Sequence, residues 1–137
     1  MNLDEFVPRS PKDILAEFAH LPRMLDKARA YKKRTLGEYI YPCPIDVLLL
    51  NFLGLNVDEF AEKAGELDDI SFENWLKEIG NKWNVDEKNR LNRSILKRKV
   101  GLLKSLRYTF SLRKKLKLSE WKITTWPDYV DWEEGRI

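Results

Sequence analysis

The chain has 137 residues, of which 43% are hydrophobic and 34% charged, proportions typical of a folded protein rather than a disordered one. This length predicts one domain over residues 1–137, with a core large enough to fold without a metal or a disulfide. The most apolar window, residues 45–55, is shorter than the roughly 20 residues that cross a bilayer. The first eight residues lack the apolar core of a secretory signal, so we expect a cytoplasmic protein without a membrane partner.

The net charge of +3 is unevenly distributed along the chain. Residues 88–117 contain twelve Lys and Arg and no Asp or Glu. The residues before this stretch have a net charge of −6, and those after it have −3. A cationic stretch of this kind suits a partner rich in phosphate, although acidic segments of the same chain can also neutralise it.

The first elements are predicted from proline and from helical spacing. Residues 1–8 are expected to be extended, and Ser10 followed by a proline is typical of a helix start, which predicts a helix over residues 11–19. Pro22 then interrupts this helix and starts a second one. The apolar positions of the second helix recur at helical spacing: Leu21, Met24, Leu25, Ala28 and Tyr31.

A connector over residues 35–44, with a short extended piece at residues 38–41, leads to a very apolar helix. Cys43 is the expected N-cap of this helix, which covers residues 44–53, and Gly54 is the expected left-handed residue at its end. Because the helix is apolar nearly all round, we expect it to lie at the centre of the fold.

Capping signals predict the next three helices. Asn56, followed three residues later by Glu, starts a helix that ends near Gly65. Ser71 or Asp69 caps another helix, and Asn84 begins a basic one with the same Asn-to-Glu spacing. No alternating strand pattern is present. We predict an all-α fold, a compact single-domain bundle of about six helices, in which residues 118–137 form an irregular aromatic and acidic C-terminal strap.

Charged residues on the second helix are the first candidate site. They are Arg23, Asp26, Lys27 and Arg29, and Asp26 is three positions from each arginine. Such a group can bind an anion, with the carboxylate orienting the guanidiniums. The competing interpretation is a solvated helix face with ordinary ion pairs.

The single cysteine, Cys43, is the second candidate. A thiol at a helix start can be reactive, and Glu38 or Asp46 would then act as proton acceptor in a thiol-dependent enzyme. The competing interpretation is a small buried residue in a rigid turn. His20 is the only histidine and no paired cysteines are present, so the sequence predicts neither a metal site nor a cofactor.

The basic stretch is the third candidate, as a nucleic-acid interface. Its cations could neutralise phosphates, and Tyr108 and Phe110 could stack on bases. Alternatively the stretch is solvated or paired with the acidic segments. The residues that would contact nucleic acid are Lys97, Arg98, Lys99, Lys104, Arg107, Arg113, Lys114 and Lys115.

Three segments together carry a family resemblance: RSPKDILAEFAHLPRMLDKARA, TLGEYIYPCPIDVLLLNFLGL and the ending DWEEGRI. They resemble the domain of unknown function 5069 family over residues 9–65 and at the C-terminus, whereas the basic middle departs from the pattern. The resemblance implies a small, cytoplasmic, mainly helical bacterial protein without an assigned activity, and it supplies no catalytic residues. The residues that match the family motif are Arg23, Asp26, Lys27, Arg29, Glu38, Tyr39, Cys43 and Asp46.

A motif rich in charged residues indicates either a shared site or a shared buried polar network. Our leading hypothesis is a pocket between the Arg23–Arg29 helix face and the connector at residues 38–46. Its expected ligand is an anionic small molecule or a peptide carboxylate, bound by Arg23, Asp26, Lys27, Arg29, Glu38, Tyr39 and Asp46.

Overall fold

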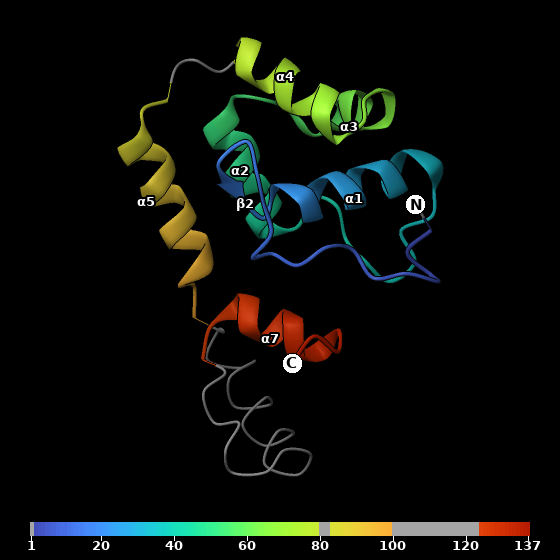
Figure 1. Cartoon of the computed structure of the whole chain (residues 1–137). Coiled ribbons are helices and arrows are strands. Elements are labelled where there is room, and N and C mark those ends of the chain that lie inside the picture. Colours follow the sequence, from blue (N-terminus) through green and yellow to red (C-terminus); the bar gives the residue numbers. More distant parts are fainter. Residues whose placement is uncertain (1, 80–82, 100–123) are drawn as a thin grey trace.

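The computed structural model describes residues 2–79, 83–99 and 124–137, and within these ranges the fold is mainly helical with one very small sheet (Figure 1). The elements are β1 (Ile14–Leu15), β2 (Phe18–Ala19), α1 (Leu21–Lys33), α2 (Pro44–Leu53), α3 (Val57–Glu66), α4 (Asp69–Ile79), α5 (Val85–Leu96) and α7 (Trp126–Glu133). The other helices surround α2, and the C-terminal helix, α7, lies below α1 and α2 in this view.

The helix predicted over residues 11–19 is wrong, because this segment is a tight antiparallel hairpin of β1 and β2. Ala16 and Glu17 at its tip both have positive φ, which excludes helical geometry there. The Asn92 side chain from α5 holds the hairpin: it accepts from the Ala19 amide at 2.9 Å and donates to the Glu17 carbonyl at 2.7 Å. The fold is therefore not strictly all-α.

The two helices that contribute most to the site, α1 and α2, begin as predicted, and α2 also ends as predicted. Pro22 lies in the first turn of α1, and Cys43 is the N-cap of α2. Gly54 ends α2 with φ of 73°, in the left-handed region that glycine enters without strain. The predicted extended piece at residues 38–41 is instead part of a turn-rich connector.

The capping predictions for α3 and α5 are confirmed. The side chains of Asn56 and Asn84 each accept from a backbone amide three residues later, both at 2.8 Å. For α4 neither predicted cap, Asp69 or Ser71, is the one observed: Asp68 accepts from the Ser71 amide at 2.7 Å.

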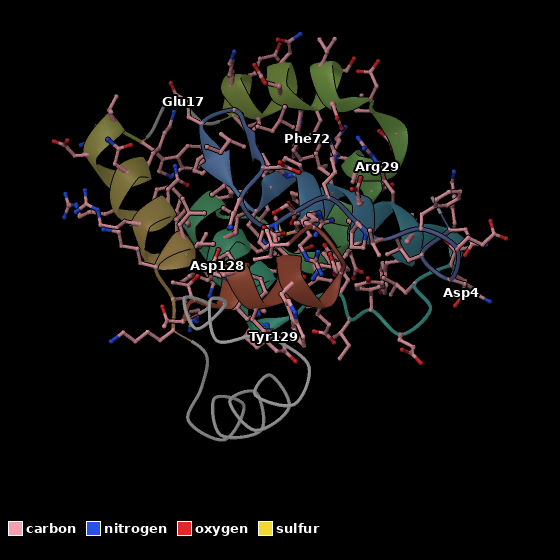
Figure 2. All side chains as sticks on the ribbon, turned by 60° about the horizontal axis from the view of Figure 1, so that its bottom comes forward. Asp4, Glu17, Arg29, Phe72, Asp128 and Tyr129 are labelled. Atoms are coloured by element: carbon pink, nitrogen blue, oxygen red, sulfur yellow. The ribbon has the colours of Figure 1, made fainter. Side chains whose placement is uncertain are left out.

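The C-terminal strap predicted over residues 118–137 is not irregular where the structure describes it. Thr125 caps α7 by accepting from the Asp128 amide at 3.3 Å, and a proline follows in the first helical turn. Residues 118–123 lie outside the described ranges. Figure 2, turned so that the lower face comes forward, shows α7 with Asp128 and Tyr129 crossing in front of α2.

The hydrophobic core lies against the inner faces of α1 and α2. Its largest fully buried aromatic rings are Phe18, Phe60 and Phe72, contributed by β2, α3 and α4. In the part of the chain that the structure describes, no helix is long and apolar enough to cross a membrane.

Candidate functional site

Three of the four charged residues in the candidate group on α1 are buried, and Arg29 is half-buried. Arg23, Asp26 and Lys27 are only 6%, 4% and 3% exposed. The interpretation of this group as a solvated helix face is therefore wrong. Buried charges require partners, because desolvation without compensation is very costly. Each of the three finds its partner on a different segment of the chain.

Asp26 binds Arg9 rather than the arginines of its own helix. It accepts from the Arg9 backbone amide at 2.9 Å and from the guanidinium at 3.1 Å. Arg9 and Arg29 both also bind Asp69, at 2.6 Å and 2.9 Å, so α1, α4 and the N-terminal segment share one network. Asp26 and Arg29 face this network, away from the connector, so they do not join the predicted ligand site.

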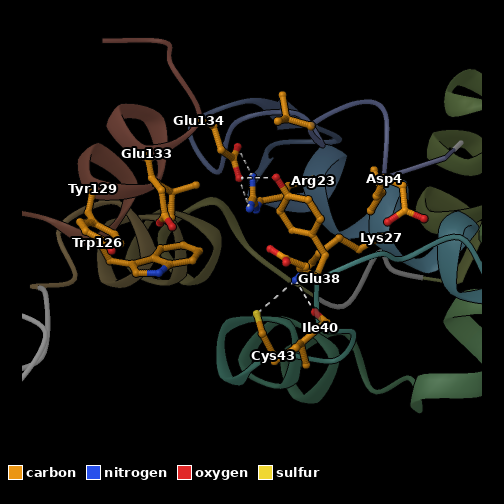
Figure 3. A pocket seen from close by; sticks show the side chains of 14 residues that line it. Asp4, Arg23, Lys27, Glu38, Ile40, Cys43, Trp126, Tyr129, Glu133 and Glu134 are labelled. Carbon is orange, nitrogen blue, oxygen red and sulfur yellow. Dashed lines mark hydrogen bonds and ion pairs between the residues drawn. The ribbon is translucent and has the colours of Figure 1, made fainter.

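Arg23 binds the last turn of the chain (Figure 3). Its two terminal nitrogens donate to the two carboxylate oxygens of Glu134 at 2.8 and 2.7 Å, a bidentate arrangement. Tyr39 donates to the same carboxylate at 3.2 Å. Burial alone would raise the pKa of Glu134, but the hydrogen bonds and charge of Arg23 outweigh it and lower that pKa. This contact fastens α7 to α1 and to the connector.

Lys27 connects α1 to the start of α2. Its ammonium donates to the Ile40 carbonyl at 3.1 Å, to the Cys43 sulfur at 3.3 Å and to Asp46 Oδ2 at 2.6 Å. An ammonium has three protons, so these contacts use all of them. Asp46 also accepts from the Cys43 amide at 2.9 Å, which stabilises the helix start that the prolines flank.

His20 lies behind this ion pair, on the side of the core. Its Nε2 is 2.6 Å from Asp46 Oδ1, and both side chains are fully buried. Burial lowers the pKa of His20, so the ring is neutral near pH 7 and donates from Nε2. Burial would raise the pKa of Asp46, but the His20 hydrogen bond and the Lys27 charge lower it to about 2. Among the described side chains, His20 Nδ1 is the buried polar atom that lacks a partner.

The first question about this cluster is whether it could bind a metal ion. One ligand atom from each of His20, Cys43 and Asp46 lies within 4.8 Å of the other two. The Lys27 ammonium contacts the carboxylate and the sulfur, however, and it supplies the positive charge that a metal would bring. The set also provides only three protein ligands, one fewer than a closed structural zinc site. The residues present therefore fit the Lys27 ammonium better than they fit a metal ion.

A cavity of about 560 Å³ opens beside these contacts, between α1, the connector and α7. Figure 3 shows Trp126, Tyr129 and Glu133 on the α7 side and Glu38, Ile40 and Cys43 on the other. Of the predicted ligand-binding residues, four line it, together with the candidate thiol: Arg23, Lys27, Glu38, Tyr39 and Cys43. Asp46 contacts Lys27 but is not among the lining residues.

Sequence reasoning missed several residues that shape this region. Arg9 and His20 gave no periodic signal, since one lies in the N-terminal segment and the other just before α1. Glu134 belongs to the ending DWEEGRI, so the family motif could have indicated it. Trp126 could have been suggested by the aromatic content of the tail.

The predicted nucleic-acid residues are only partly described. Lys97, Arg98 and Lys99 are exposed, and within the described ranges no ion pair involves them. The acidic C-terminal residues that could have neutralised them bind Arg23, Lys12 and Arg136 instead. The remaining members lie outside the described residues: Lys104, Arg107, Arg113, Lys114 and Lys115.

Comparison with known families shows to which family the chain is similar. The family model described as a domain of unknown function (DUF5069) matches residues 5–136, nearly the whole chain. The match includes the basic middle, so the departure expected there does not interrupt it. No curated protein matches the chain.

Proposed function

Because the chain belongs to the DUF5069 family, whose function is not known, we propose from the geometry alone that it is a binding protein for a small polar molecule. The observation that supports the proposal is the 560 Å³ cavity, a volume within the range of about 300–1,000 Å³ that small-molecule sites occupy. The lining combines aromatic rings with charged side chains held in fixed positions. A site whose side chains are preorganised by their own hydrogen bonds loses less conformational entropy when a ligand binds.

The motif residues support this proposal through their positions. Arg23, Lys27 and Cys43 hold the wall of the cavity by contacts to Glu134 and Asp46. The resemblance left two alternatives open, a shared site and a shared buried network. The two are compatible under this proposal, because the network forms the wall that the ligand would contact. The sequence predicted an anionic ligand instead. Binding an anion at Arg23 would require the ion pair between Arg23 and Glu134 to break.

A plugged cavity tests the proposal. Ile40 lines the cavity yet is 69% exposed, so Ile40→Trp should obstruct it with little effect on folding. Ile70→Trp is the matched control, because Ile70 is 76% exposed on α4, away from the cavity. We expect saturation-transfer NMR against cationic, neutral and anionic metabolites to identify ligands that bind wild type and Ile70→Trp but not Ile40→Trp. The proposal fails if no compound binds, or if both variants bind alike.

Nucleic-acid binding is a second candidate, favoured by the exposed cations Lys97, Arg98 and Lys99. An electrophoretic shift assay at low and high salt tests it, with these three residues changed to Glu. Binding that weakens with salt and is lost in the variant supports the candidate. Absence of binding at low salt excludes it.

A further inference from the structure

The cations of the cavity have few donors left for a ligand. Lys27 uses its three protons on Ile40, Cys43 and Asp46. Arg23 uses both terminal nitrogens on Glu134, and one of them also on the Arg9 carbonyl. An anion would have to replace a buried, bidentate carboxylate, and breaking such a pair is costly. The cavity as it stands is a poor receptor for negative charge.

Carboxylates, in contrast, outnumber cations in the lining. Four of them line the cavity: Asp4, Glu38, Glu133 and Glu134. Glu134 is neutralised by Arg23 and Arg136, and Lys27 is neutralised by Asp46. Within the described ranges, no ion pair involves the other three lining carboxylates. Among the described residues, the carboxylates in the space between α7 and the connector therefore carry negative charge that no ion pair neutralises.

Aromatic rings on the α7 side complement this charge. Trp126 and Tyr129 line the cavity beside Glu133, and Glu38 lies across from them (Figure 3). Burial raises the pKa of Tyr129, and the neighbouring Glu133 carboxylate raises it further. Ring faces and carboxylates together are the chemistry that stabilises an ammonium group, through cation–π attraction and charge-assisted hydrogen bonds. Arg23 already lies over the Tyr39 ring, 5.6 Å from its centroid, in such a contact.

We propose that the ligand of this cavity is a small molecule with a protonated amine, held by Glu38 and Glu133 against Trp126. This inference rests on the proposed function and specifies its ligand class. The volume admits a metabolite with a short chain. An amine requires no internal salt bridge to break, whereas an anion does.

Three four-carbon probes that differ in charge test the inference: 1,4-diaminobutane, 1,4-butanediol and succinate. Each is titrated into the full chain at low salt, with calorimetry as the readout. We expect the diamine alone to bind, and Ile40→Trp to abolish its binding. Glu38→Gln should weaken it about tenfold, the effect of losing one hydrogen bond to a charged group. Glu78→Gln, the same change at an exposed position of α4, should leave the affinity unchanged.

The outcomes separate this inference from the proposed function. If succinate or butanediol binds as tightly as the diamine and Ile40→Trp abolishes that binding, the cavity is a ligand site but the amine inference is overturned. Equal diamine affinity in Glu38→Gln and Glu78→Gln also overturns it. If none of the probes and none of the screened metabolites binds, both proposals fail.

Discussion

Replacing Asp46 by asparagine should be among the most damaging isosteric changes in this protein. Asp46 is fully buried and lies 2.6 Å from both Lys27 Nζ and His20 Nε2. At that distance, with an effective dielectric constant of about 20, the attraction to Lys27 is about 6 kcal/mol before desolvation is counted. The amide removes the charge, leaving the ammonium buried without a counter-charge. We expect the free energy of unfolding to fall by about 3–5 kcal/mol, the usual cost of breaking a buried pair.

Urea denaturation followed by tryptophan fluorescence measures this loss. Asp86→Asn is the matched control, because Asp86 is exposed in the first turn of α5 and should cost less than about 1 kcal/mol. Adding Lys27→Met removes the stranded charge, so the double variant should lose less stability than the two single variants together. An Asp46→Asn protein as stable as Asp86→Asn, or strictly additive single changes, would show that the buried Lys27–Asp46 pair does not stabilise the fold.

Four further results are expected. Because the pKa of Asp46 is lowered from 3.8 to about 2, its contribution of about 2 kcal/mol is present above pH 4 and lost toward pH 2; the stability gap between wild type and Asp46→Asn should narrow by that amount between pH 5 and 2. Since burial lowers the pKa of His20, its NMR signals should titrate with a midpoint below 6.5, and a midpoint at or above 6.5 would contradict its burial. Gly54→Ala, at φ of 73° with open space around it, should cost about 1–2 kcal/mol by denaturation, and an unchanged midpoint would refute the strain argument. Cys43 should be alkylated more slowly in the native protein than in urea, because it is half-buried; a faster native rate would instead favour the thiol-enzyme hypothesis.

The helices that the sequence predicted correctly are those set by local signals. Pro22, Asn56 and Asn84 satisfy or pre-arrange the first turn of their own helices, and Gly54 ends its helix by its own conformation. Such effects act within a few residues, so they can be recognised without knowing the fold.

The hairpin before α1 could not be predicted in this way. Its segment carries a helix-start signal, but the hairpin is bound by Asn92, more than seventy residues later, and Phe18 packs into the core. Tertiary contacts of this kind override local preference without leaving a periodic trace.

The charged face of α1 shows the same limit at the candidate site. The spacing of Arg23, Asp26 and Lys27 is equally compatible with a solvated face and with a buried network. The buried network is the arrangement observed, because three other segments of the chain supply the partners Glu134, Arg9 and Asp46. The family motif included Arg23, Asp26, Lys27 and Asp46, but the contacts that each of them makes follow from the fold.

The amine site is tested most directly by following the backbone and indole signals of the full chain by two-dimensional NMR as 1,4-diaminobutane is added. We expect shifts confined to the residues around the cavity, above all the Trp126 indole and the amides of Glu38 and Glu133. Shifts centred on α4, or no shifts at millimolar diamine, would contradict the proposed amine site.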